Sequence, residues 1–194
     1  MAVRAYSWLH ETEAREHTME CRALSLRGRE HELLYRSEKP TNWPADAAFE
    51  ARGDAPEDVP WSCLWPLVSD RLRFLIESNG LTGATCYPVQ VISRLPVPIP
   101  RYWYVHFQHL EEAINYERST WVRRNIELPS GEIDGRIIMI KYVLKRRAIE
   151  GWDLFRCIVR SGGTSGIFCS ERFRDLFIEH GCTGLNFLPV PVTE

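Results

Sequence analysis

The residues best suited to chemistry in this chain are its six histidines and six cysteines, and their spacing limits what they could do. His17 and Cys21 are four residues apart, and His106 and His109 are three apart. A zinc site needs three or four ligands at matched spacing. The other histidines and cysteines are dispersed, so we expect surface or half-buried histidines and no metal site.

A nucleophilic enzyme would need a serine or cysteine beside a histidine base. Cys169 and Ser170 stand at a predicted helix N-terminus, where a thiolate would be stabilised. However, Val68 and Ser69 occupy the same places in a second, similar segment, so a buried apolar residue and an N-cap explain the pair. There is no GxSxG motif, and the glycine-rich segment 161–166, predicted as a turn or flexible loop, lacks the lysine of a phosphate-binding loop. The sequence therefore predicts no cofactor and a protein that is not an enzyme.

Charged clusters could instead contact a partner protein. A basic pair, and a second basic group at 141–147, could meet an acidic surface or a phosphate backbone, or simply form a solvated face. An acidic loop could pair with a basic partner and speed association. Two tryptophans bracket that loop, and tryptophan is enriched at binding hot spots. The candidate partner-binding residues are Trp43, Asp46, Glu50, Asp54, Glu57, Asp58, Trp61, Arg123 and Arg124.

The overall charge and hydropathy exclude several classes of protein. The 194 residues carry 24 Lys and Arg against 26 Asp and Glu, a net charge of −2. A protein that binds nucleic acid through charge would show a clear basic excess. The longest apolar stretches, such as 137–140, are far shorter than a membrane span, and residues 1–10 lack an apolar run of signal-peptide length. We therefore expect a soluble, cytoplasmic protein with no nucleic-acid or membrane partner.

The cysteines allow two interpretations. An even count would suit disulfide pairing, but no two cysteines form a CxxC pair. Cys86, Cys157 and Cys169 lie inside apolar runs, where a free cysteine is a common small core residue. Reduced thiols are therefore favoured, which agrees with a cytoplasmic protein.

Two segments of the chain are copies of one another. SDRLRFLIESNGLTGATCYPV at 69–89 and SERFRDLFIEHGCTGLNFLPV at 170–190 align without a gap, 101 residues apart, with nine of 21 positions identical. The identical pairs are Ser69/Ser170, Arg71/Arg172, Arg73/Arg174, Leu75/Leu176, Gly80/Gly181, Thr82/Thr183, Gly83/Gly184, Pro88/Pro189 and Val89/Val190. Such agreement predicts two repeated structural units.

Each copy reads as a capped helix, a glycine turn and a strand. The serine is a good N-cap, and an acidic residue follows in the first turn. Apolar residues then fall at i, i+3 and i+4, until Gly80 or Gly181 ends the helix in the left-handed region. The strands predicted at 84–92 and 185–190 contain Pro88 and Pro189, which cannot donate to a ladder, so both strands should lie at sheet edges.

The remaining elements complete an α+β fold with mixed or antiparallel sheets. Residues 1–60 form an N-terminal region with short strands and a proline- and acid-rich loop at 40–61, and residues 61–194 form the main body. Stiff prolines at 95–100 predict an extended connector. The predicted strands outside the repeat are 22–26, 33–35, 102–107, 137–144 and 154–159.

The order of motifs in the body resembles a known family. WPLVS at 65–69 is followed by the capped helix and GLTGATCYPV, then by YWYV at 102–105, AINYERS at 113–119, KYVLK at 141–145, DLFR at 153–156, and finally IFCS and the second repeat. Over about residues 61–194 this is similar to the immunity proteins of bacterial polymorphic toxin systems, immunity family eleven, formerly a domain of unknown function.

The resemblance implies a cytoplasmic protein that neutralises one cognate toxin by direct contact and has no catalytic residues. The motifs are capping and turn signals, not chemistry. Two alternatives stay open from the residues themselves. One is a small hydrolase or transferase with an unrecognised site, and the other is a scaffolding module in a larger complex. The edge strands are compatible with either a monomer or a homodimer.

Overall fold

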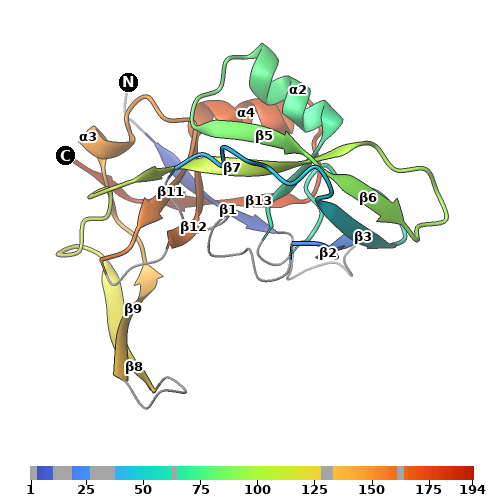
Figure 1. Cartoon of the computed structure of the whole chain (residues 1–194). Helices are drawn as coiled ribbons and strands as arrows, with labels where there is room; N and C mark the ends of the chain where they lie inside the picture. Colours follow the sequence, from blue (N-terminus) through green and yellow to red (C-terminus); the bar gives the residue numbers. More distant parts are fainter. Residues whose placement is uncertain (1–3, 11–18, 27–37, 63–64, 128–132, 161–163) are drawn as a thin grey trace.

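The computed structural model describes residues 4–10, 19–26, 38–62, 65–127, 133–160 and 164–194. The fold is α+β, as predicted, and consists mostly of strands (Figure 1). The large sheet contains β1 (Ala5–His10), β4 (Leu67–Ser69), β5 (Ala84–Pro88), β7 (Tyr102–Leu110), β11 (Leu154–Ile158), β12 (Thr164–Ser170) and β13 (Leu185–Val190). The other strands are β2 (Met19–Ala23), β3 (Ala48–Gly53), β6 (Gln90–Ser93), β8 (Thr120–Glu127), β9 (Ile133–Lys141), β10 (Leu144–Lys145) and β14 (Val192–Thr193). The helices of the described residues are α2 (Asp70–Ser78), α3 (Arg146–Ile149) and α4 (Glu171–Glu179).

The large sheet has the strand order β13-β1-β12-β11-β7-β4, with β5 also paired to β7. β11 and β7 run parallel, and the other pairs are antiparallel. Tyr104 of β7 is opposite Leu67 of β4 and also opposite Tyr87 of β5, so β5 lies on the far side of β7 from β4. Among the described strands, β5 pairs only with β7 and β13 only with β1, so both lie at edges of this sheet, and β4 also has a single partner. The edge positions predicted from Pro88 and Pro189 are confirmed.

The strands around the two copied segments have matching neighbours. β7 lies between β4 and β5, and β1 lies between β12 and β13. Each helix thus connects a strand to an edge strand across one intervening strand, and that central strand comes from elsewhere in the chain. The corresponding rows across three strands are Val68–Trp103–Pro88 and Cys169–Tyr6–Pro189.

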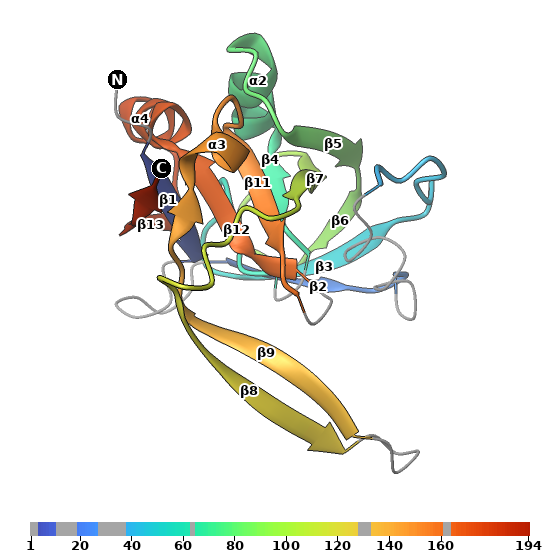
Figure 2. The same cartoon turned by 90° about the vertical axis from the view of Figure 1, so that its left-hand side faces the viewer.

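Helices α2 and α4 lie side by side over one face of the large sheet (Figures 1 and 2). Ser69 and Ser170 are the N-caps, and each hydroxyl accepts from a helix N–H at 3.2 Å. Gly80 and Gly181 follow the helices with φ of 59° and 61°, as predicted. The buried residues of the two helices meet the sheet in the largest core cluster; they are Leu72, Leu75, Ile76, Phe173 and Phe177.

The opposite face of the large sheet is covered in two places. The small sheet β2-β3-β6 packs over β4 and β7, where Tyr102 and Tyr104 are fully buried together with Phe49. Further along, α3 and β10 pack over β11 and β12, around Phe155 and Phe168. Alternate residues of β7 thus serve different clusters, because side chains alternate across a strand.

Strands β8 and β9 form a two-stranded sheet that extends away from the rest of the molecule (Figures 1 and 2). We call this pair the hairpin arm. Its base is fixed by Ser119, whose hydroxyl accepts from the N–H of Val143 at 2.9 Å. Ile137 and Met139 on one side of the arm pack against the core cluster of Phe155 and Phe168.

Several element boundaries differ from the sequence prediction. The loop predicted at 40–61 contains β3, whose Phe49 and Ala51 are buried while their neighbours face outward. The strand predicted at 84–92 is broken at Val89, and its second half joins β3 as β6. The segment 164–166, predicted as part of a turn, belongs to β12.

Other predicted elements are shifted or longer. The strand predicted at 22–26 is β2, three residues earlier, and 33–35 lies outside the described residues. The strand predicted at 102–107 continues to Leu110, and 137–144 corresponds to β9 and the start of β10. The strand predicted at 154–159 is confirmed as β11, and 185–190 is confirmed as β13.

Candidate interaction site

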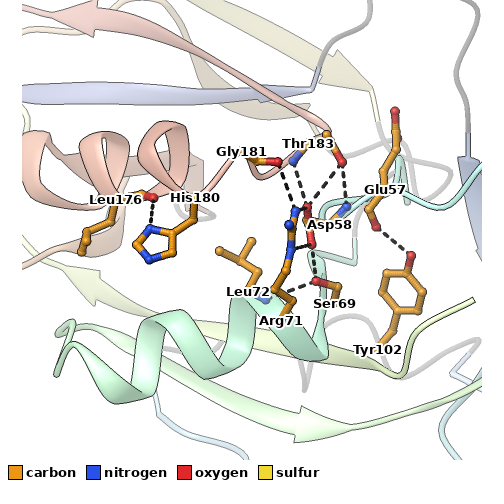
Figure 3. Close-up of polar contacts among 10 residues, drawn as sticks. All are labelled: Glu57, Asp58, Ser69, Arg71, Leu72, Tyr102, Leu176, His180, Gly181 and Thr183. Atoms are coloured by element: carbon orange, nitrogen blue, oxygen red, sulfur yellow. Dashed lines mark hydrogen bonds and ion pairs between the residues drawn. The ribbon is translucent and has the colours of Figure 1, made fainter.

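The carboxylate of Asp58 lies at the centre of a network of polar contacts (Figure 3). Oδ1 accepts from the Ser69 hydroxyl at 2.6 Å and from Nε of Arg71 at 3.1 Å. Oδ2 accepts from Nη2 of Arg71 and, at 3.0 Å, from the backbone N–H of Thr183. Arg71 also donates to the carbonyl of Gly181 at 3.1 Å. One buried carboxylate therefore joins the start of α2 to the loop after α4.

Asp153 makes the reciprocal connection. Its carboxylate accepts from the Ser170 hydroxyl at 2.7 Å, from Nη1 of Arg172 at 3.3 Å and from the backbone N–H of Thr82 at 3.0 Å. Arg172 also donates to the carbonyl of Asn79. The start of α4 is thus joined to the loop after α2. The two networks use the identical Ser, Arg and Thr residues of the copied segments.

Backbone hydrogen bonds connect the same two pairs of segments. The N–H of Val59 donates to the carbonyl of Thr183 at 3.1 Å, and the N–H of Leu154 donates to the carbonyl of Thr82 at 3.0 Å. The chain passes so closely here that a Cβ on Gly83 would overlap the carbonyl oxygen of Leu154, and one on Gly184 would overlap that of Val59. These glycines have φ of 87° and 97°, a region that side chains rarely adopt.

The second arginine that the two segments share covers an aromatic ring in each of them. Arg73 lies 4.2 Å from the Trp103 ring centroid, and Arg174 lies 4.3 Å from the Tyr6 ring centroid. Trp103 donates to Asp70 at 2.9 Å, and the Tyr6 hydroxyl donates to Glu171 at 3.4 Å. All eight side chains at the four polar positions that the two segments share therefore have partners inside the molecule: Ser69/Ser170, Arg71/Arg172, Arg73/Arg174 and Thr82/Thr183.

These contacts decide the chemistry open to Asp58 and Ser170. Burial tends to raise the pKa of Asp58, but the hydrogen bonds from Arg71, Ser69 and Thr183 together outweigh it and lower the pKa. Asp58 is thus held as an anion by its neighbours. The Ser170 hydroxyl donates to Asp153 and accepts from the helix, so its environment is that of a cap, not of an activated nucleophile.

The thiols and imidazoles are also in structural surroundings. Cys169 is fully buried, and desolvation raises its pKa, so the thiolate of a reactive cysteine is disfavoured. His106 and His109 are buried with ring centroids 5.4 Å apart. Within the residues that the structure describes, no three His, Cys, Asp or Glu side chains gather in a way that could hold a metal ion. Of the pair His17 and Cys21 considered from the sequence, Cys21 is buried in β2 and 17 lies outside the described residues.

The acidic residues predicted to face a partner lie in different environments. Asp58 is 6% exposed and lies inside the network above, and the carbonyl of Glu57 accepts from the Tyr102 hydroxyl at 2.7 Å. Glu50 pairs with Arg52 at 2.6 Å and with Arg94 at 3.1 Å. Asp46 and Asp54 are exposed. The loop therefore offers only part of its predicted negative charge to a partner.

The two tryptophans bracketing the loop are both half-buried. Trp43 stacks on Tyr104, with centroids 4.6 Å apart, and its indole N–H donates to the carbonyl of Pro88 at 2.8 Å. Trp43 therefore packs against residues of β5 and β7 inside the molecule. Trp61 takes part in a β-bridge to Glu20, beside β2.

Arg123 and Arg124 both lie exposed on the hairpin arm. The neighbouring exposed apolar residues escaped the sequence prediction, because β8 itself was not predicted. Val122 is 45% exposed, Ile138 40% and Ile140 63%. Ile138 and Ile140 are exposed, whereas Ile137 and Met139 between them are half-buried. All four are apolar, so the sequence alone does not show which of them face outward; the pairing of β8 with β9 does.

The fold and the site describe a small protein without a recognisable catalytic centre among its described residues, held by two internal polar networks, with an extended arm. Comparison with protein families agrees with the resemblance noted from the motifs. The model of the Immunity protein family (Imm11) matches residues 8–192, and the chain belongs to this family. The match includes most of the first 60 residues, so it reaches further than the resemblance over 61–194. No curated protein matches the chain.

The family assigns a general role as an immunity protein, which favours a non-enzymatic inhibitor. Among the described residues, no helix is both long enough and apolar enough to cross a membrane.

Proposed function

We propose that this protein binds one cognate toxin of a bacterial polymorphic toxin system and neutralises it by direct protein–protein contact in the cytoplasm. The observation that supports this most strongly is the family match over 8–192. The polar contacts of the described residues support the same role, because the groups that could have formed a catalytic centre, Asp58, Asp153 and Ser170, hold the two halves of the fold together.

The surface that this proposal needs is available on the described residues. Asp46 and Asp54 offer negative charge, and Arg123 and Arg124 offer positive charge. A toxin that is held tightly needs a buried apolar contact as well, since a few well-packed residues carry most of the binding free energy. The inhibitor then acts by covering the toxin's active site or by fixing the toxin in an inactive shape.

The test uses a candidate cognate toxin, sought as a toxin module encoded next to the gene for this chain. The toxin is expressed from an inducible promoter with and without this chain, and an affinity tag on this chain reports co-purification. We expect growth to be restored and the two proteins to elute together. If the toxin kills equally fast in both strains and does not co-purify, the proposed function is wrong.

A small enzyme or a scaffolding module would behave differently in the same experiment. An enzyme that inactivated the toxin would protect at substoichiometric amounts and leave no stable complex. A scaffold would bind without protecting. A dose series of this chain against a fixed toxin level separates the three outcomes, because a stoichiometric inhibitor protects only above a one-to-one ratio.

A further inference from the structure

The hairpin arm has two unlike faces. Residues directly opposite each other in an antiparallel pair lie on the same side. Val122 is opposite Ile138, and Arg124 is opposite Arg136. We call these four residues, together with Ile140 at the bulge next to Thr120, the outer face. The other side contains Ile137 and Met139, which pack against the body.

The outer face exposes apolar surface without covering any of the protein's own core. Its three aliphatic residues, Val122, Ile138 and Ile140, are between 40% and 63% exposed. Trp121 on the opposite side is 42% exposed and is fixed at the base, where its indole N–H donates to the carbonyl of Tyr116 at 3.2 Å. Grouped exposed apolar residues of this kind are typical of interaction surfaces.

The charge of the arm identifies the kind of surface that would fit it. Two of the five residues of the outer face, Arg124 and Arg136, are basic and exposed, while the two strands also contain the acidic Glu127 and Asp134. The side chain of Arg123 lies over Gly135. A Cβ added to this glycine would come within 2.9 Å of Nε of Arg123. The outer face therefore presents three aliphatic residues next to the guanidinium groups of Arg124 and Arg136, and arginine is enriched at protein interfaces while other charged residues are depleted.

This pattern favours a protein over a nucleic acid. The outer face has aliphatic side chains at its centre and lacks the aromatic stacking surfaces of single-strand binders, and the whole chain has a net charge of −2. A complementary protein surface would have an apolar cleft with carboxylates at its rim. Burying Val122, Ile138 and Ile140 in such a cleft would remove them from water and pair the arginines with the rim.

We propose that the outer face of the hairpin arm is the surface that docks into the toxin, in an apolar cleft rimmed by carboxylates. The inference rests on the proposed function, and it adds the contacting element and the chemistry of the toxin surface. The arm's position on the molecule suits this role, since it extends away from the body and can enter a cleft that the body could not reach (Figure 2).

The test measures, with purified proteins and matched variants, the dissociation constant for the candidate cognate toxin of the co-expression experiment above. The apolar variant Ile138→Ser/Ile140→Ser is compared with Leu188→Ser/Ile92→Ser, whose original side chains are 55% and 52% exposed on strands of the body. The charge variant Arg124→Glu is compared with Arg101→Glu, an exposed arginine of the body. Thermal unfolding of each variant verifies that it folds.

We expect each arm variant to bind at least about tenfold more weakly, and the body variants to stay within about threefold of the unchanged protein. Arg124→Glu should also slow association, and the difference should shrink at high salt. If the arm variants bind as tightly as the unchanged protein, the arm is not the docking surface, although the proposed function stands. If the unchanged protein itself neither binds nor protects, the proposed function fails.

A second measurement tests the inference without variants, in case these fold poorly. Amide hydrogen exchange of the unchanged protein, free and in complex, should show protection in 120–127 and 133–141. Lack of protection there would overturn the inference. Light scattering of the free protein tests whether the outer face instead joins two copies of this chain. In that case the unchanged protein is a dimer, the arm variants are monomers and the affinity for the toxin is unaltered. This result would also overturn the inference.

Discussion

Thr183 donates its backbone N–H to the carboxylate of Asp58 at 3.0 Å, although 125 residues separate the two in the chain. Thr82 has the same relationship with Asp153, also at 3.0 Å. Each aspartate precedes one helix, and each threonine follows the other helix. The two contacts therefore close the α2 and α4 halves on one another, and they explain why the two segments share serine, arginine and threonine at matching positions.

Asp58 should be important for stability. Asp58→Asn keeps the size of the side chain but removes the charge that Arg71 and the N–H of Thr183 face, so we expect a loss of about 2–4 kcal/mol in the free energy of unfolding. The exposed side of Arg71, 57% accessible, keeps the effect from being larger. Urea unfolding measures it, and Asp54→Asn at an exposed position serves as the control. A difference under 0.5 kcal/mol between the two variants would contradict the assigned role.

The same carboxylate predicts how stability depends on pH. The pKa of Asp58 is lowered in the folded protein, so the folded state binds fewer protons there than the unfolded state. Its contribution is complete above the unfolded pKa of about 3.9, and is lost as pH falls through the lower folded value. Unfolding midpoints from pH 7 down to pH 3 should therefore fall more steeply for the unchanged protein than for Asp58→Asn. Parallel curves would show that Asp58 does not titrate as described.

The glycines of the copied segments should differ in their tolerance of alanine. Gly83 and Gly184 lie against the carbonyls of Leu154 and Val59, so alanine there meets both a steric overlap and an unfavourable φ. Gly80 and Gly181 have a similar φ, but nothing lies within 4 Å of an added Cβ. We expect Gly80→Ala to cost about 1 kcal/mol and Gly83→Ala about 3 kcal/mol or more. Thermal unfolding of the two variants tests this, and equal losses would mean that the close approach does not exist.

The thiols should be unreactive in the folded protein. The five cysteines of the described residues are free, and desolvation raises the pKa of Cys21, Cys86 and Cys157 to about 12 and that of Cys182 to about 11. A shift from 9 to 12 lowers the thiolate fraction at pH 8 about a thousandfold. A thiol reagent should therefore label these cysteines slowly until denaturant is added, with Cys182 the first of them. Rapid labelling of Cys157 without denaturant would contradict its burial.

Local sequence signals were sufficient to predict the elements whose ends or positions depend on neighbouring residues in the chain. Ser69 and Gly80 mark the ends of α2 because a cap and a left-handed glycine act within one helical turn. Pro88 and Pro189 place β5 and β13 at edges because a proline cannot donate. The strand at 185–190 needed nothing beyond its own pattern.

The rest depends on contacts between distant residues. In the sequence, Asp58 is indistinguishable from the other acidic residues of the loop, and it was predicted to face a partner. The fold brings Thr183 within hydrogen-bond distance of it. The acidic and proline-rich residues around Phe49 led to the prediction of a loop where β3 lies. This strand is defined by its pairing with β2 and β6, which are distant in the sequence. The candidate interface was affected in the same way: Arg123 and Arg124 were visible as a basic pair, but Val122 and Ile138 become neighbours only when β8 pairs with β9.

The most direct test of the proposed function is a calorimetric titration of this protein into its candidate cognate toxin, together with the toxin's activity in the same samples. We expect binding at a one-to-one ratio with a dissociation constant in the nanomolar range or below, because an immunity protein must stay bound at cellular concentrations. Toxin activity should disappear at the equivalence point. Absence of measurable binding, or full toxin activity in the saturated complex, would contradict the account.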